Sequence, residues 1–454
     1  MHLRKRLWAI LVLLVLTAIT FLVSTRELAQ DRDKSILQVF EKKKESIYFW
    51  YNDENMSDYV NSAAVKFGKI YDVRVFPQLV SESQYLEAIN HATLYSEHMP
   101  DVFLISNDSL EKAYLAGLAT PVEDVSQRMN TIHFPQIAID AVTYKGKQVA
   151  YPLFFETSVL LYNETFLKEW ALQQVKKEAE EAGRAPNETA ELAQRDELMK
   201  NAVPKTIDDI LKIADTFDPP ETVDGIFRWD VSDIFYNYYF VGNYMTLGGV
   251  TGDDKTQVNL NNPEVIACLE IYKALNQFFY IEADAVSYAN VLQDFIDGKI
   301  VFTIATTDAL AILDEAVENG EFSYEYKVAP LPDPGEELKG RALSVTGCVA
   351  VNGYSEKKLL AEQFAAYLTT DYTTQLYDRS KKMAVYNLTD FNQEAFLVYR
   401  EEYENSVSLP KMIETGNYWV QLEVLFSKVW NEGNVTQLVT ELSNRIHAQV
   451  NAEE

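Results

Sequence analysis

One carboxylate in this sequence stands where an apolar side chain is expected. Glu156 follows Phe155 within residues 144–164, a stretch that predicts two short apolar strands joined at Pro152. Burying an unpaired charge costs on the order of several kcal/mol, so this acid needs a partner. Ligand hydroxyls, a cation and water are the alternatives, and all three make Glu156 a candidate hydrogen-bond acceptor in a binding site.

Short polar clusters follow two predicted strands. They are Asn52, Asp53 and Glu54 after the strand at 46–51, and Asp108 with its neighbours after the strand at 101–105. In folds that alternate strands and helices, ligands gather at the carboxyl ends of the strands. Helix capping by Asp, Asn and Ser would account for one residue of each cluster. Ligand contact and capping therefore both stay open.

Aromatic side chains beside polar groups form a third set of candidates. Asp233 and Tyr236 belong to one such segment, and Tyr418 and Trp419 follow Asn417 at the start of a predicted helix. Sugar rings have apolar C–H faces and hydroxyl rims, so carbohydrate sites pair flat aromatic rings with carboxylates and amides. Packing in the core is the alternative for the first segment, because Tyr and Phe are usually buried.

The sequence lacks the motifs of catalysis. It has no phosphate-binding glycine loop, no Gly-x-Ser-x-Gly, no His-Glu-x-x-His and no EF-hand loop, and its five histidines are scattered. We therefore predict no enzyme, no cofactor and no metal site. A glycosidase that uses Glu156 as its acid is the enzymatic alternative, but such an enzyme needs a second carboxylate across one cleft.

Length and charge limit the classes of protein. A chain of 454 residues predicts two or three domains. Its net charge of −28 excludes nucleic acid and anionic lipid as partners of the main body, because both require a basic face. Cys268 and Cys348 both stand in apolar surroundings and are interpreted as core residues; nothing in the sequence supports a disulfide between them.

The N-terminus predicts export. Basic residues precede an uncharged apolar run at 7–23, so residues 1–23 read as a signal or anchor helix. We expect an uncleaved signal anchor, with a cleaved signal peptide and secretion as the alternative. Residues 24–45 form a charged spacer next to the membrane. The rest of the chain is expected on the extracytoplasmic face.

The elements that must position these candidates follow an alternating pattern. Strands are predicted at 46–51, 71–76 and 101–105, with helices at 57–68 and 82–91 between them. This alternation indicates an α/β fold with parallel strands and crossover helices. Residues 168–201, rich in Glu, Ala and Lys, predict a solvated helical hairpin inserted into the pattern. Thr206 and Asp209 then predict a capping box at a helix start.

Six segments in order resemble a known family. They are 101–108 with 116–122, 144–163, 204–209, 295–302, 329–332 and 361–369. From about residue 46 to the C-terminus the chain is similar to extracellular solute-binding proteins of the maltose-binding-protein type. These are the receptor components of carbohydrate ABC importers.

The resemblance implies a periplasmic-binding-protein type II fold. Two α/β lobes are joined by a hinge with several crossovers, behind the N-terminal membrane helix. Lobe 1 would take residues 46–155 plus 344–385. Lobe 2 would take residues 156–343 plus 386–454, with the insertion at 168–201.

The resemblance also implies a site and a function. Glu156 falls where the family has a sugar-binding carboxylate, Asp108 matches a second one, and Trp419 or Tyr418 falls where an aromatic ring stacks on the sugar. The implied ligand contacts are Asn52, Asp53, Glu54, Asp108, Glu156, Asp233, Tyr236, Asp308, Tyr418 and Trp419. The implied function is binding of a sugar or oligosaccharide by a monomer that closes about its hinge and docks on an ABC permease. A membrane-anchored sensor or scaffold with the same fold is the alternative.

The chain departs from the family pattern at three places. Ile105 stands where relatives have a Trp, Ser109 replaces an Arg that follows the acid, and Asp308 or a neighbour replaces a stacking Trp. Specificity for malto-oligosaccharides therefore does not follow from the resemblance.

Overall fold

The computed structural model describes residues 44–81, 84–124, 126–283, 285–388 and 393–452. The anchor helix predicted at 7–23 and nearly all of the spacer predicted at 24–45 lie outside these ranges. Within them, no helix is both long enough and apolar enough to cross a membrane.

A single mixed sheet of ten strands connects the whole molecule. Its main path runs β2-β1-β3-β12-β6-β10-β7, and β11, β13 and β14 pair beside that path. The strands are β1 (Ser46–Tyr51), β2 (Arg74–Leu79), β3 (Val102–Ser106), β6 (Tyr151–Asn163), β7 (Gly225–Phe227), β10 (Ile300–Thr306), β11 (Tyr326–Ala329), β12 (Leu343–Val351), β13 (Met383–Ala384) and β14 (Val407–Ser408). Two small hairpins stand apart from it, β4 (Thr143–Tyr144) with β5 (Lys147–Gln148) and β8 (Thr246–Gly248) with β9 (Asp254–Asn259).

Strand β6 is the long central element of this sheet. It pairs with β12 as far as Thr157 and with β10 from Ser158 onward. The prediction of two short strands joined at Pro152 is wrong, because Pro152 lies inside the single strand β6. The register between β6 and β12 shifts at a bulge beside Cys348, the partner of Pro152, and a bulge is where a sheet tolerates a residue without an N–H donor.

The alternating pattern predicted near the N-terminus is confirmed. The strand predicted at 46–51 is β1, and it pairs in parallel with β2 and β3. Helix α2 (Ser57–Tyr71) and helix α3 (Tyr85–Tyr95) connect these strands. The second strand lies three residues later than predicted, because the chain leaves α2 through Asp72 in the left-handed conformation.

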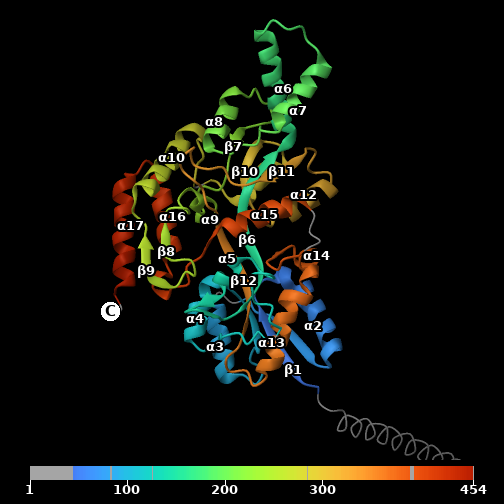
Figure 1. The fold of residues 1–454 in the computed structure, drawn as a ribbon, viewed down its shortest axis with the longest axis vertical. Helices are drawn as coiled ribbons and strands as arrows, with labels where there is room; N and C mark the ends of the chain where they lie inside the picture. The colour runs from blue at the N-terminus through green and yellow to red at the C-terminus, as the bar shows by residue number, and fades with distance from the viewer. Residues whose placement is uncertain (1–43, 82–83, 125, 284, 389–392, 453–454) are drawn as a thin grey trace, which may run out of the picture.

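The helices surround the sheet along its length. In Figure 1, α2, α3, α4 and α13 gather with β1 at the lower end, α6, α7 and α8 lie with β7 and β10 at the upper end, and β6 runs between. The remaining helices are α4 (Leu110–Leu115), α5 (Gln136–Ala141), α6 (Glu164–Glu181), α7 (Glu188–Met199), α8 (Ile207–Thr216), α9 (Ile234–Asn237), α10 (Pro263–Phe279), α11 (Tyr288–Ile296), α12 (Ala309–Glu318), α13 (Lys358–Ala366), α14 (Leu376–Ser380), α15 (Glu394–Asn405), α16 (Tyr418–Trp430) and α17 (Val435–Val450).

Helices α6 and α7 form the block predicted at 168–201 and project from the top of the molecule in Figure 1. Asn163 and Asn187 cap their N-termini, and α7 has no buried residue. The capping box of Thr206 and Asp209 is also confirmed at the start of α8. The local polar signal therefore located the start of α8 correctly, whereas α6 begins at Glu164, before the predicted block.

Two clusters of buried side chains form the core, and β6 contributes to both. Val159 and Leu161 belong to the first cluster, whereas Leu160 and Tyr162 belong to the second. The first cluster spans β1 to β3 and also takes in residues of α11, α12 and α15, so buried packing continues across the predicted lobe boundary. The boundaries of the two lobes stay a prediction. Both cysteines are buried and free, as their apolar surroundings suggested.

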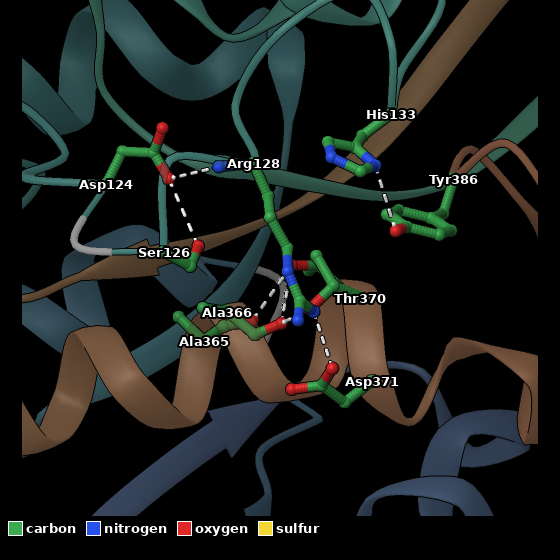
Figure 2. A network of polar contacts seen from close by, with 10 residues as sticks. Asp124, Ser126, Arg128, His133, Ala365, Ala366, Thr370, Asp371 and Tyr386 are labelled. Atoms are coloured by element: carbon green, nitrogen blue, oxygen red, sulfur yellow. Dashed lines mark hydrogen bonds and ion pairs between the residues drawn. The ribbon is translucent and has the colours of Figure 1, made fainter.

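Polar contacts link the loop that follows α4 to residues 370–371 and to Tyr386 (Figure 2). Arg128 donates to the Thr370 hydroxyl over 2.9 Å and forms an ion pair with Asp371. The hydrogen bond to Asp371 raises the pKa of the Arg128 guanidinium. On the other side, His133 Nδ1 lies 3.0 Å from the Tyr386 hydroxyl, and the two rings stack. These contacts lie on either side, along the chain, of residues 380–382, which line the cavity described below.

A buried lysine joins the two core clusters. Lys411 Nζ donates to the carbonyl oxygens of Asp140, over 2.9 Å, and of Thr251. Asp140 follows the first-cluster residue Ala138 on α5, whereas Thr251 lies in the β8–β9 loop beside the second cluster. Burial lowers the pKa of Lys411 to about 8, although the nearby carboxylate of Asp253 partly opposes the shift.

Replacing one β6 side chain should reveal how much the strand stabilises the fold. Leu161→Ala removes a fully buried side chain, so we expect the free energy of unfolding to fall by about 2–5 kcal/mol in urea titrations. The control Leu359→Ala removes an exposed side chain on α13 and should change it by about 0.5 kcal/mol. Equal losses in the two variants would contradict the central role of β6.

Lys411 predicts a distinctive pH dependence of stability. Between about pH 8 and the unfolded lysine pKa of about 10.4, the unfolded chain binds more protons at this site, so stability should rise with pH. We expect a contribution on the order of 2 kcal/mol that is absent in Lys411→Met. Urea unfolding across this pH range measures it. If the stability of wild type and variant changes with pH in parallel, Lys411 is not the source of the pH dependence.

Candidate ligand-binding site

A cavity of about 1160 Å³ opens beside the middle of β6. Its walls come from segments far apart in the sequence: the ends of β10 and β12, helices α9, α12 and α16, and the chain that follows α14. Five residues predicted as ligand contacts line it: Glu156, Asp233, Tyr236, Asp308 and Trp419. The fold therefore gathers half of the predicted contacts around one space.

Glu156 is paired with a lysine. Lys382 Nζ lies 2.6 Å from Glu156 Oε1 and 3.0 Å from Asp53 Oδ2, so one ammonium bridges two predicted contacts. Burial alone would lower the pKa of Lys382, but the two carboxylates raise it above its ordinary value. Of the three partners considered for Glu156, the structure supplies a cation. One ammonium for two carboxylates leaves this cluster with a net negative charge.

Backbone pairing places Lys382 opposite the acid. Met383, the next residue, pairs with Phe155 on β6, which brings Lys382 alongside Glu156. The lysine Nζ lies 5.2 Å from the centroid of the Phe154 ring, close enough for a cation–π contact. Gly347 makes room for that ring, because a Cβ there would come within 2.3 Å of it.

Stacked tyrosines form one wall of the cavity. The rings of Tyr236 and Tyr288 are parallel within 19° and their centroids are 5.0 Å apart. Tyr288 donates its hydroxyl to Asp308 over 3.0 Å, and Thr306 donates to the same carboxylate oxygen. Burial raises the pKa of both tyrosines, which keeps the phenols neutral. This wall places aromatic rings beside the Asp308 carboxylate, whose position is fixed by these two hydrogen bonds.

Two further acids face the cavity near α9 and α16. Asp233 caps α9 and accepts a hydrogen bond from the Phe235 amide over 2.8 Å. The side chain reaches solvent, yet the surrounding walls restrict its hydration and raise its pKa. Burial also raises the pKa of Glu423, and the negative charge of Asp233 adds to that shift. The two carboxylates are therefore close enough to interact unfavourably.

Trp419 and Tyr418 lie on different sides of the same wall. Trp419 is half-buried and lines the cavity, with its ring 6.0 Å from that of Tyr238. Tyr418 is 1% exposed and belongs to a second cavity of about 410 Å³, which Trp419 also lines. Of this predicted aromatic pair, Trp419 faces the large cavity.

The other predicted contacts lie on nearby loops. Asn52 and Glu54 are exposed after β1, and their neighbour Asn55 lines the cavity instead. Asp108 accepts a hydrogen bond from the Ser106 hydroxyl in the turn after β3. None of these three predicted contacts is among the described residues of the cavity wall. In the same described ranges, no group of His, Cys, Asp or Glu side chains is arranged to hold a metal ion.

Sequence reasoning missed several wall residues. They are Lys381, Lys382, Tyr288, Asp314, Glu315, Glu318 and Glu423. The adjacent lysines offered no distinctive signal, because lysine runs also occur at 42–44, 176–177 and 357–358. Tyr288 and the acids of α12 carry no local signal, because their place in the wall depends on how distant segments pack.

Comparison with known proteins identifies the family. The sequence profile of bacterial extracellular solute-binding proteins matches residues 59–383, more than half of the chain. The chain belongs to this family. Membership confirms the resemblance seen in the sequence, and it agrees with the prediction that this solute-binding protein is not an enzyme.

Relatives of this solute-binding protein share its fold at low sequence identity. It is 22% identical over 277 residues to the maltotriose-binding protein of Pyrococcus abyssi (strain GE5 / Orsay), a match that covers 60% of this chain. The chain spans about half (51%) of the length of that curated relative.

Two solved structures have a similar fold. The extracellular solute-binding protein of Staphylococcus aureus in complex with maltose has a TM-score of 0.70 at 18% identity, covering 91% of this chain and 100% of that one. The maltose-binding periplasmic protein MalE of Listeria monocytogenes, also with maltose, has a TM-score of 0.69 at 19% identity, covering 90% and 99%. The α/β fold of maltose-binding proteins is thereby confirmed for this chain.

Removing the bridging lysine should destabilise the site. In Lys382→Met, the carboxylates of Glu156 and Asp53 lose their shared cation, and we expect stability to fall by about 1 kcal/mol. The loss is small because the two acids are 36% and 27% exposed and water screens them. Thermal unfolding at low and high salt measures it, since salt should reduce the difference.

The neighbouring Lys381 provides the control. Its ammonium lies over the Tyr377 ring, 5.4 Å from the centroid, so Lys381→Met should leave stability nearly unchanged. If both variants lose equal stability at low salt, the bridge does not stabilise the protein.

Proposed function

We propose that this chain binds a sugar or oligosaccharide outside the cytoplasm and delivers it to an ABC importer. The observation that carries the proposal is the cavity beside β6, where Glu156, Asp233, Asp308, Tyr236 and Trp419 face one space. Carboxylates accept hydrogen bonds from sugar hydroxyls, and aromatic rings cover the apolar C–H faces of the sugar. The names of the relatives, which bind maltose or maltotriose, support the same ligand class.

Ligand binding would close two lobes about a hinge. In this proposal, lobe 1 takes residues 46–155 plus 344–385, lobe 2 takes residues 156–343 plus 386–454, and Glu156 lies at the first crossover. A ligand that contacts both lobes has a higher affinity for the closed form and shifts the population toward it. The closed monomer would then dock on a membrane permease.

The remaining predicted contacts lie on loops that closure of the lobes would bring to the ligand. Asn52, Asp53, Glu54 and Asp108 follow strands of lobe 1, and closure would bring such loops toward a ligand held by lobe 2. Residues 7–23 would anchor the protein to the outer face of the membrane. If that segment is cleaved, the protein is secreted.

Titration with sugars tests the proposal. Isothermal calorimetry of the full-length chain with a panel of oligosaccharides should find at least one ligand, and that ligand should raise the melting temperature. Trp419→Ala removes the stacking ring and Glu156→Gln removes a charged acceptor, so we expect each to weaken binding by about tenfold or more.

A second half-buried tryptophan gives the matched control. Trp170 on α6 donates to Thr216 and lies outside the cavity wall, so Trp170→Ala should bind the same ligand with unchanged affinity. Failure of every sugar in the panel to bind would refute the proposal. Equal weakening by Trp170→Ala and Trp419→Ala would place the site elsewhere.

A further inference from the structure

Negative charge dominates the cavity wall. Among the described residues that line it, seven carboxylates face two ammonium groups. The acids are Glu156, Asp233, Asp308, Asp314, Glu315, Glu318 and Glu423, and the bases are Lys381 and Lys382. A cavity with this balance attracts cations and repels anions.

Neither lysine neutralises the carboxylates that α9, α12 and α16 contribute to the cavity. Lys382 is held between Glu156 and Asp53, and Lys381 Nζ lies over the ring of Tyr377. Both bases therefore already have partners on their own side of the cavity. The carboxylates of α12, α9 and α16 must find their counter-charge in solvent or in a ligand.

Helix α12 concentrates three of these acids on one face. Asp314 and Glu315 each lie about one turn from Glu318, at i,i+4 and i,i+3 spacing, and all three are exposed and line the cavity. Asp314 accepts a hydrogen bond from the Tyr326 hydroxyl over 3.2 Å. Glu315 and Glu318 form no ion pair within the part of the chain that the structure describes. Like charges at this spacing destabilise a helix, and a bound cation would relieve that repulsion.

Aromatic rings give independent support for a ligand that is both cationic and sugar-like. Tyr236, Tyr288 and Trp419 line the same space as the acids, and the first two rings stack on each other. Ring faces attract ammonium groups and also pack against the C–H faces of sugars. A simple metal ion would use only the carboxylates, whereas an amine carried on a sugar ring would use both kinds of surface.

We infer that the ligand is an amino-sugar oligosaccharide, whose protonated primary amines meet the carboxylates of α12 while its rings pack on Tyr236, Tyr288 and Trp419. This inference rests on the proposed function, because it assigns the ligand class of the same cavity. Lys382 fits it by partly neutralising Glu156, so that the hydroxyl-binding end and the amine-binding end of the cavity differ in charge.

N-acetylation provides the decisive comparison, because it removes the charge of each amine and keeps the sugar frame. Calorimetry of the full-length protein at about pH 6, above the reference pKa of glutamate, would use the glucosamine trimer, the N-acetylglucosamine trimer and maltotriose. We expect the glucosamine trimer to bind at least about tenfold more tightly than either neutral sugar at low salt. High salt should reduce this preference.

A pair of charge-matched variants tests the contribution of α12. Glu315→Gln/Glu318→Gln should reduce the ratio of glucosamine-trimer to maltotriose affinity by about tenfold. The control Glu336→Gln/Glu337→Gln removes the same charge from two exposed residues outside the cavity wall, and it should leave that ratio unchanged.

The outcomes separate the inference from the proposed function. If maltotriose or the acetylated trimer binds as tightly as the amine, the amino-sugar assignment is overturned and sugar binding stands. A fall in the ratio that is equal in both double variants also overturns it, because overall charge would then be the cause. If no sugar binds, the proposed function fails and the inference fails with it.

Discussion

The structure depends on the backbone pairing of one thirteen-residue strand, β6. Because this strand is buried, its N–H and C=O groups need partners along nearly its whole length. Strands β12 and β13 pair with its first half, and β10 and β11 pair with its second half. Its buried side chains at 159–162 alternate between the two core clusters. The change of partners next to Glu156 therefore determines where the sheet leaves space for a ligand.

The site follows from this change of partners. Pairing of β13 with β6 brings Lys382 to Glu156. Strand β10, which also pairs with β6, leads through Asp308 into α12. Both sides of the cavity are therefore positioned by pairing with the same strand. An acid that would be costly in a closed core is stable here because an ammonium pairs with it and because its side chain is 36% exposed to solvent. The register of the sheet therefore decides which side chains meet at the cavity.

The acidity of the chain has two physical meanings. Over most of the surface it provides solvation, as the exposed acids of α7 show. At the cavity it is concentrated on walls whose two lysines already have partners.

The sequence by itself determined the local elements and the family. Apolar runs and caps gave β1, α2 and the α8 start, and Glu156 was conspicuous because a charge inside an apolar strand is expensive. Only the tertiary structure decided that residues 144–164 contain one long strand after a short hairpin, that Tyr418 faces away from the large cavity, and that Lys382 is the partner of Glu156. These facts depend on strand register and on packing between segments up to 226 residues apart, which no local pattern encodes.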